Sequence, residues 1–143
     1  ATALVVAFEA GAEPNRSLEA RVRSQLDRFR VRHAEHSPSR FAAAFDGPAR
    51  AVQCARAVQD DARQLNVRTR MGLHTGELVC ESGSPLGGSA VVVASRVLEC
   101  AQWDQVLATG TLRDLAAGSG LGFRPCGHVQ AAGFGEWPLL EVR

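Results

Sequence analysis

Short apolar runs alternate along this chain with stretches in which apolar residues recur at every third or fourth position. Residues 3–8 and 40–45 are apolar runs of strand length, and the second, built from Phe and Ala, predicts an internal strand. Residues 67–73 alternate Val, Thr, Met and Leu with Arg and Gly, which is the two-residue period of a strand. Residues 105–108 form one more short candidate strand.

Helical periodicity marks three further segments, each with one apolar face. The repeating positions are Leu18, Val22, Leu26, Phe29, Val52, Ala55, Val58, Ala62, Val91, Ala94 and Leu98. Asn15 or Ser17 could cap the first helix, and Pro48 fits the first turn of the second. Residues 111–117 predict a fourth, short helix that Gly118 closes in a left-handed conformation.

The segment after the third candidate strand is interpreted as a hairpin. Residues 74–76 (His-Thr-Gly) form the expected tight turn into a strand at residues 77–80, followed by a Gly- and Ser-rich loop at residues 81–88. Two late strands are expected near residues 121–125 and 136–142. Because a hairpin makes neighbouring strands antiparallel, the pattern predicts an α+β fold with a mixed sheet and helices on one face.

Length and charge exclude several classes of protein. The chain has 143 residues, which predicts a single domain over residues 1–143. The net charge is +1, from 16 basic and 15 acidic residues, so we expect no strong positive electrostatic potential that would attract nucleic acid. Basic residues gather between Arg16 and Arg40, but acids and Gln lie among them, which favours a solvated helix face.

The cysteines and the apolar runs bear on the cellular compartment. Cys54, Cys80, Cys100 and Cys126 have no paired or zinc-type spacing, so we expect buried, reduced thiols and no metal site. No secretion signal is visible, and no apolar run approaches the roughly 20 residues of a membrane helix. The expectation is a cytoplasmic protein without a membrane segment.

Three stretches in order resemble the bacterial class III adenylate/guanylate cyclase homology domain. They are residues 41–55 (FAAAFDGPARAVQCA), 70–77 (RMGLHTGE) and 87–113, which contains GGSAVVVASRV and QVLATGTLRDL. The resemblance is strong from Phe41 to Gly120 and weak before Arg40. It implies a ferredoxin-like α+β core, and head-to-tail dimers with nucleotide sites at the dimer interface.

Cyclisation of a nucleoside triphosphate needs two carboxylates that hold divalent metals. At the family's first metal position the resemblance places Phe8, or Glu9 if the strand register shifts by one residue, and Glu9 could equally be a surface residue. At the second metal position it places Ser39, whose neutral hydroxyl is a weak ligand. Arg40 follows directly and adds a positive charge where a cation would have to sit.

The remaining family positions are also largely changed. The base-reading Lys aligns with Ala131, and the ribose-orienting Asn aligns with Val92. The transition-state Arg is matched by Arg96, which is the one conventional catalytic group that remains. Arg96 could equally form a salt bridge on the helix surface.

The favoured hypothesis is a catalytically degenerate cyclase-like domain that serves as a dimerisation, ligand-binding or regulatory module without a cofactor. The expected partner is a second copy or a related cyclase-like chain, and a nucleotide or other small molecule is a candidate ligand. The dimer is expected to bury the third helix around Val92 together with the His74 hairpin. The alternative hypothesis is a divergent active cyclase that uses Glu9 and Arg96 to convert ATP or GTP to the cyclic nucleotide and pyrophosphate.

Overall fold

The computed structural model describes residues 1–9, 16–37 and 39–143. The strands are β1 (Thr2–Phe8), β2 (His33–Ser37), β3 (Arg40–Phe45), β4 (Thr69–Thr75), β5 (Val106–Thr109), β6 (Phe123–Ala131) and β7 (Gly135–Val142). The helices are α1 (Arg16–Arg28), α2 (Pro48–Gln64), α3 (Ser89–Cys100) and α4 (Gly110–Leu115). The expected strands at β1, β3, β4, β5 and β7 and all four expected helices are confirmed.

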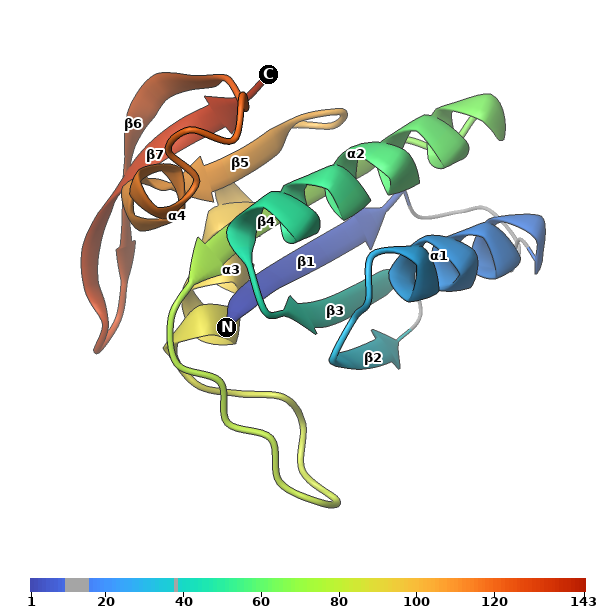
Figure 1. The fold of residues 1–143 in the computed structure, drawn as a ribbon, viewed down its shortest axis with the longest axis horizontal. Helices are drawn as coiled ribbons and strands as arrows, with labels where there is room; N and C mark the ends of the chain where they lie inside the picture. The colour runs from blue at the N-terminus through green and yellow to red at the C-terminus, as the bar shows by residue number, and fades with distance from the viewer. Residues whose placement is uncertain (10–15, 38) are drawn as a thin grey trace.

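All the described strands form one mixed sheet in the order β2-β3-β1-β4-β5-β7-β6 (Figure 1). β4 and β5 are parallel, and every other neighbouring pair is antiparallel. β1 and β4 lie in the middle of the sheet, and their residues include the fully buried Leu4, Val6, Met71 and Leu73. β3 has neighbours on both sides, as its apolar composition predicted.

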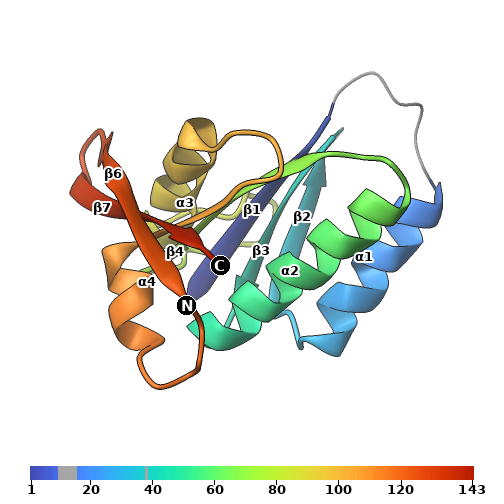
Figure 2. The ribbon, with the colours of Figure 1, turned by 90° about the horizontal axis from the view of Figure 1, so that it is seen from above.

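The helices cover both faces of the sheet, so the prediction of helices on one face was wrong (Figure 2). β1 shows the reason, because both of its faces are apolar. Leu4 and Val6 belong to the cluster that contains α1, α2 and Leu112 of α4, whereas Ala3 and Val5 pack against α3. A strand that is buried on both faces has a continuous apolar sequence. Such a sequence does not show which helices cover which face of the sheet.

The predicted hairpin at His74 is absent from the described residues. β4 continues through Thr75, and residues 77–80 form no strand beside it; the segment makes one isolated bridge between Val79 and Gly87. β1 and β5 already pair with the two edges of β4, so no edge is open for a further strand. The mixed sheet was predicted correctly, but the strand antiparallel to β4 is β1 and not the predicted strand at residues 77–80.

Three further features depart from the sequence-based expectation. β2 was not predicted, because its sequence HAEHS has no apolar alternation; it is an edge strand that pairs only with β3. β6 begins at Phe123 and extends to Ala131, past a register shift between Pro125 and Gly127. Of the two candidate caps of α1, Ser17 lies inside the helix, and Asn15 lies outside the described residues.

Helix α3 lies unusually close to β4. A Cβ atom added at Gly72 would come within 2.3 Å of the Ala94 carbonyl oxygen and 2.5 Å of the Leu98 amide nitrogen. Both of these are backbone atoms of α3, so no side-chain movement could make room. Gly72 therefore sets the distance between this helix and the centre of the sheet.

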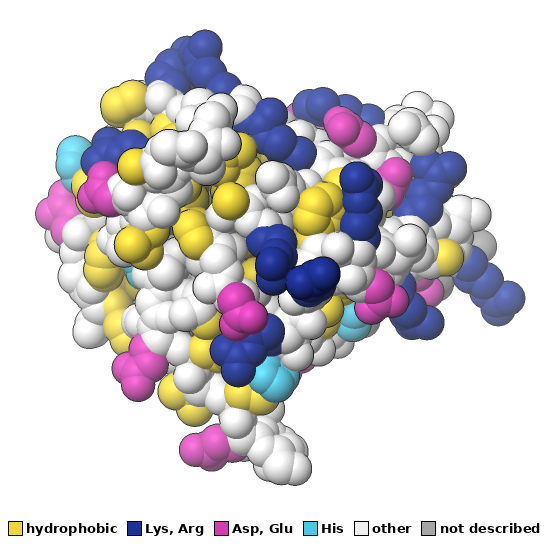
Figure 3. All heavy atoms as spheres, viewed as in Figure 1, with side chains coloured by type: hydrophobic (Ala, Val, Ile, Leu, Met, Phe, Trp, Pro, Cys, Tyr) yellow, Lys and Arg dark blue, Asp and Glu magenta, His cyan; other side chains and the backbone are white. Residues whose placement is uncertain are grey.

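The surface chemistry follows the sequence in part. Figure 3 shows arginine side chains spread over the face of α1, α2 and α4 among acidic ones, and Arg21–Asp61 and Arg32–Asp46 are ion pairs on it. All four cysteines are free thiols, but only Cys54 is buried, so the expectation of buried thiols was wrong for the other three. No helix among the described residues is long and apolar enough to cross a membrane.

Candidate functional site

The last residues of β1 and the first residues of β3 lie side by side. They carry the two positions, Phe8 and Ser39, at which the resemblance implies metal-binding carboxylates. The backbone N–H of Phe8 donates to the carbonyl of Ser39 at 2.8 Å. The ring of Phe8 packs against Phe41, with 5.9 Å between ring centroids. The side chain of Phe8 therefore packs against other apolar residues on the face of the sheet that carries α1 and α2.

Ser39 precedes β3 in a left-handed backbone conformation, with φ of 56°. Such a conformation is uncommon for residues other than glycine and is typical of tight turns. Arg40 follows as the first residue of β3 and is half-buried. We refer to Phe8, Glu9, Ser39 and Arg40 as the strand-end cluster.

Glu9 is held by an arginine. Both of its carboxylate oxygens accept hydrogen bonds from Arg68, at 2.6 Å from Nη2 and 3.1 Å from Nε. This hydrogen-bonded ion pair holds the pKa of Glu9 below its usual value. The backbone N–H of Glu9 also donates to the Arg68 carbonyl at 2.9 Å. A carboxylate already paired in this way matches the surface role that was one of the two expectations for Glu9.

A second group of candidates lies on α3 and the end of β6. Val92 is 40% exposed, whereas its neighbours Val91 and Val93 are buried. Arg96 lies one turn further along; its Nη1 is 2.7 Å from a Glu99 oxygen, and its Nε donates to the Gln130 carbonyl at 3.2 Å. Ala131, next to Gln130, is buried. We refer to Val92, Arg96 and Ala131 as the α3 cluster.

The structure thus gives Arg96 the surface ion pair that was its alternative reading, with Glu99 three residues later on the same helix. Both groups remain half-exposed, so the pair is accessible to solvent and contributes little to stability. Arg96 also ties α3 to β6 through the Gln130 carbonyl. Arg96 is thus bonded within the chain, to Glu99 of α3 and to Gln130 of β6.

His74 is a residue whose environment the sequence did not reveal. It is 1% exposed, its Nδ1 lies 2.6 Å from the Thr109 hydroxyl oxygen, and its ring packs edge-on against Trp137 at 4.6 Å. Burial lowers the pKa of His74 to about 4 from an ordinary value of 6.5. The imidazole is therefore neutral at physiological pH and bridges β4, β5 and β7. It offers no surface to a dimer, so that part of the expected interface was wrong.

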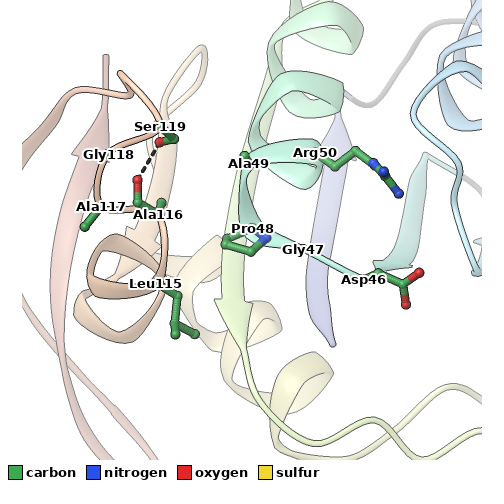
Figure 4. A pocket seen from close by; sticks show the side chains of 10 residues that line it. All are labelled: Asp46, Gly47, Pro48, Ala49, Arg50, Leu115, Ala116, Ala117, Gly118 and Ser119. Carbon is green, nitrogen blue, oxygen red and sulfur yellow. Dashed lines mark hydrogen bonds between the residues drawn. The ribbon is translucent and has the colours of Figure 1, made fainter.

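A shallow pocket lies elsewhere, between the start of α2 and the segment that ends α4 (Figure 4). Its volume is about 540 Å³, and residues 46–50 and 115–119 line it. Two polar side chains of its lining are already bonded to other residues of the chain. Asp46 pairs with Arg32 at 3.2 Å, and the Ser119 hydroxyl donates to the Ala116 carbonyl. None of the candidate site residues lines this pocket. Within the part of the chain that the structure describes, no three His, Cys, Asp or Glu side chains gather as metal ligands do.

Comparisons with known proteins identify the fold. No sequence-family model matches the chain, and no curated protein sequence matches it. The guanylate cyclase domain of RhGC from Catenaria anguillulae, solved in complex with GTP, aligns over 99% of this chain and 94% of its own, with a TM-score of 0.78 and 14% identity. The adenylyl cyclase CyaB from P. aeruginosa aligns over 99% and 92%, with a TM-score of 0.77 and 14% identity.

A third similar structure is described as a non-canonical dimeric guanylyl cyclase domain, of the RhoGC fusion protein from Blastocladiella emersonii. It aligns over 99% of this chain and 95% of its own, with a TM-score of 0.64 and 13% identity. The chain therefore has the α+β fold of the class III adenylate/guanylate cyclase domains, as the resemblance implied. The similarity is structural, and it concerns the fold.

Proposed function

We propose that this chain is a catalytically degenerate nucleotide-cyclase-like domain that acts as a dimerisation, ligand-binding or regulatory module. The observation that carries the proposal is the composition of the strand-end cluster. An aromatic ring packed on Phe41 occupies the end of β1, and Ser39 and Arg40 occupy the adjacent start of β3. An arginine beside this position repels a divalent cation, whereas triphosphate cyclisation needs two such cations neutralised by carboxylates.

Assay of the purified chain with ATP or GTP and either Mg²⁺ or Mn²⁺ tests the proposal. We expect no cyclic nucleotide, and the Arg96→Ala variant is expected to behave like the unmodified chain. Cyclic nucleotide formation that is lost in Arg96→Ala would contradict the proposal and establish the alternative of a divergent active cyclase.

The exposed side chain of Val92 supports self-association as part of this function. Helix α3 buries Val91 and Val93 against the sheet and leaves Val92 at the surface with 40% of its area exposed. The resemblance implies a polar residue at this position, so valine makes the outer face of α3 better suited to another protein surface than to a triphosphate. A two-fold interface would bring this face of each copy against the other.

Sedimentation of the Val92→Glu variant tests the dimer. A carboxylate buried without a partner is costly, so the variant is expected to dissociate at least about a hundredfold more readily than the unmodified chain. Leu115→Glu is the matched control, because Leu115 lies 60% exposed on α4, across the sheet from α3. An unmodified chain that remains monomeric at high concentration would overturn the homodimer and leave a related chain as the partner.

A further inference from the structure

A cysteine and a histidine meet at the outer edge of the sheet, away from the two candidate clusters. The Sγ of Cys80 lies 3.5 Å from the Nδ1 of His33, and the two side chains are in hydrogen-bond contact. His33 is the first residue of the edge strand β2, and Cys80 lies in the segment that leads from β4 to α3. The contact joins residues 47 positions apart, so the fold brings them together. We call Cys80 and His33 the thiol–imidazole pair.

Neighbouring contacts hold the segment that carries the thiol against β2. Val79 and Gly87 exchange two backbone hydrogen bonds of 2.9 Å, which close this segment next to the thiol. The backbone N–H of Leu86 donates to the Glu35 carboxylate at 3.0 Å. Glu35 lies two residues after His33 and therefore on the same face of β2. The position of the sulfur beside the imidazole is thus fixed by contacts of the surrounding backbone.

None of the other three thiols has an imidazole partner among the described residues. Cys54 is buried, and burial raises the pKa of its thiol to about 12. Partial burial of the sulfur and the neighbouring Glu141 carboxylate raise the pKa of Cys126. Cys100 is exposed, as Cys80 is, but forms no hydrogen bond within the described part of the chain. The chain therefore offers two exposed thiols for comparison, one with an imidazole and one without.

The thiol–imidazole pair has the geometry that thiol–disulfide exchange requires. A thiolate and not a thiol attacks a disulfide, so a proton acceptor beside the sulfur promotes the reaction. In the tautomer of His33 that carries its hydrogen on Nε2, the free Nδ1 can accept the thiol proton. Because Cys80 is exposed, a dissolved disulfide can reach its sulfur.

We propose that Cys80 is a modification site at which a small disulfide of the glutathione type forms a mixed disulfide, with His33 as the base. The Sγ attacks one sulfur of the reagent, so that a new S–S bond forms while the S–S bond of the reagent breaks. The thiol proton passes to Nδ1 of His33. The departing sulfur leaves with the electron pair of the broken bond and then takes this proton. One disulfide is consumed and one thiol is released, so the step needs no other oxidant.

Timed reaction of the folded, unmodified chain with oxidised glutathione at pH 7 tests this site. The reaction is stopped with acid at a series of times, and peptide mass mapping gives the modified fraction of each cysteine. Cys80 is expected to react about tenfold faster than Cys100 or more, since only Cys80 has a base beside it. Cys54 is expected to react only after urea unfolds the chain.

A second reagent controls for electrostatic repulsion of the negatively charged glutathione. Glu81 follows Cys80 and Glu99 precedes Cys100, so an acid lies beside each of the two thiols in the sequence. Dithiodipyridine carries no net charge at pH 7, and the same order of rates is expected with it.

Two histidine variants distinguish proton transfer from a purely structural contact. His33→Gln is expected to slow the reaction of Cys80 about tenfold and to leave that of Cys100 unchanged, because the base is lost. Loss of a purely structural contact would expose the sulfur further and raise the rate. His36→Gln is the matched control, because His36 lies on the other face of the same strand, with its ring 5.8 Å from that of Phe41. Cys80 should react in this variant as in the unmodified chain.

Three results would overturn the site: equal rates for Cys80 and Cys100, a Cys80 rate that His33→Gln does not lower, or equal slowing in His36→Gln. If His33→Gln does not fold, the comparison of the two thiols within the unmodified chain carries the test, since it needs no variant. The inference goes beyond the proposed function and does not depend on it. Failure of the thiol site leaves the proposed degenerate domain intact, because that proposal is tested by cyclic nucleotide formation and sedimentation.

Discussion

The strand-end cluster and the α3 cluster are held by different kinds of contact. In the strand-end cluster, Phe8 packs on a single aromatic neighbour, and Glu9 is fixed by one exposed arginine. In the α3 cluster, Val92 and Arg96 lie on a helix whose opposite side meets β4 with no space between the backbones at Gly72. Side-chain pairs and two single backbone hydrogen bonds, from Phe8 to Ser39 and from Glu9 to Arg68, hold the first region. Close packing of a helix backbone on a strand backbone holds the second.

This difference indicates which region can change its chemistry freely. In the strand-end cluster a side-chain replacement alters local contacts such as the Phe8–Phe41 packing, while the backbone hydrogen bonds of Phe8 and Glu9 stay in place. On α3, a change on the buried side would shift the whole helix and every group on its outer face. The strand-end cluster is therefore the region where a side-chain replacement is expected to disturb the fold less than a replacement on the buried side of α3.

The largest loss of stability is expected for a substitution at Gly72, where the backbones of α3 and β4 meet. Gly72→Val would drive side-chain atoms into the Ala94 carbonyl and the Leu98 amide. Because both are backbone atoms, we expect a loss of unfolding free energy of about 4 kcal/mol, above the usual cost of overpacking. Urea denaturation measures it. Gly47→Ala is the control, because a Cβ at Gly47 meets nothing within 4 Å, and its cost should stay below about 1 kcal/mol. Similar losses in both variants would refute the role of Gly72.

The next effect concerns pH and His74, which lies beside Trp137 beneath the α3 layer. Its folded pKa of about 4 lies below the ordinary 6.5, so the unfolded chain takes up a proton first as the pH falls. Stability is therefore complete above about pH 6.5 and decreases by about 3 kcal/mol on acidification to pH 4.

Urea midpoints of the unmodified chain and of His74→Gln, followed from pH 7 to pH 4, isolate this contribution from that of the carboxylates. The stability difference between the two proteins should shrink by about 3 kcal/mol over this range, because the variant has no imidazole to titrate. A difference that stays constant with pH would show that His74 is protonated at its ordinary pKa.

A smaller loss of stability is expected at Phe8. It tests whether the strand-end cluster is held by the packing of this ring on Phe41. Phe8→Ala removes a half-buried ring from Phe41 and should lower the unfolding free energy by about 2 kcal/mol. Phe134→Ala, in which a 40% exposed ring of the β6–β7 turn is removed, serves as the control and should cost less than about 1 kcal/mol. Equal costs would mean that Phe8 contributes no specific packing.

The smallest effect is expected at Glu9. Its ion pair with Arg68 is exposed to water and screened by salt, so Glu9→Gln should leave the urea midpoint unchanged within error at physiological ionic strength. The same measurement at low salt should show at most a slight loss. A substantial loss at both salt concentrations would show that the strand-end cluster depends on this pair and would remove the contrast with α3.

The sequence by itself determined most of the secondary structure and the candidate positions. Apolar runs at β1 and β3 and the three- and four-residue spacing in α1, α2 and α3 depend only on local patterning, because burial of one or two faces imposes the period. The three family-like stretches also identified the fold, which the comparisons confirm. Ser39, Val92, Arg96 and Ala131 could be named as family positions from their order along the chain.

Pairing of distant segments was decided only by the tertiary structure. β2 has no apolar signal because it is an edge strand, and the predicted hairpin at His74 failed because both edges of β4 belong to β1 and β5. The burial of His74, the pairing of Glu9 with Arg68 and the contact of Cys80 with His33 join residues dozens of positions apart. Sequence spacing carries no direct record of such contacts, since they arise when strands from different parts of the chain choose their neighbours and register.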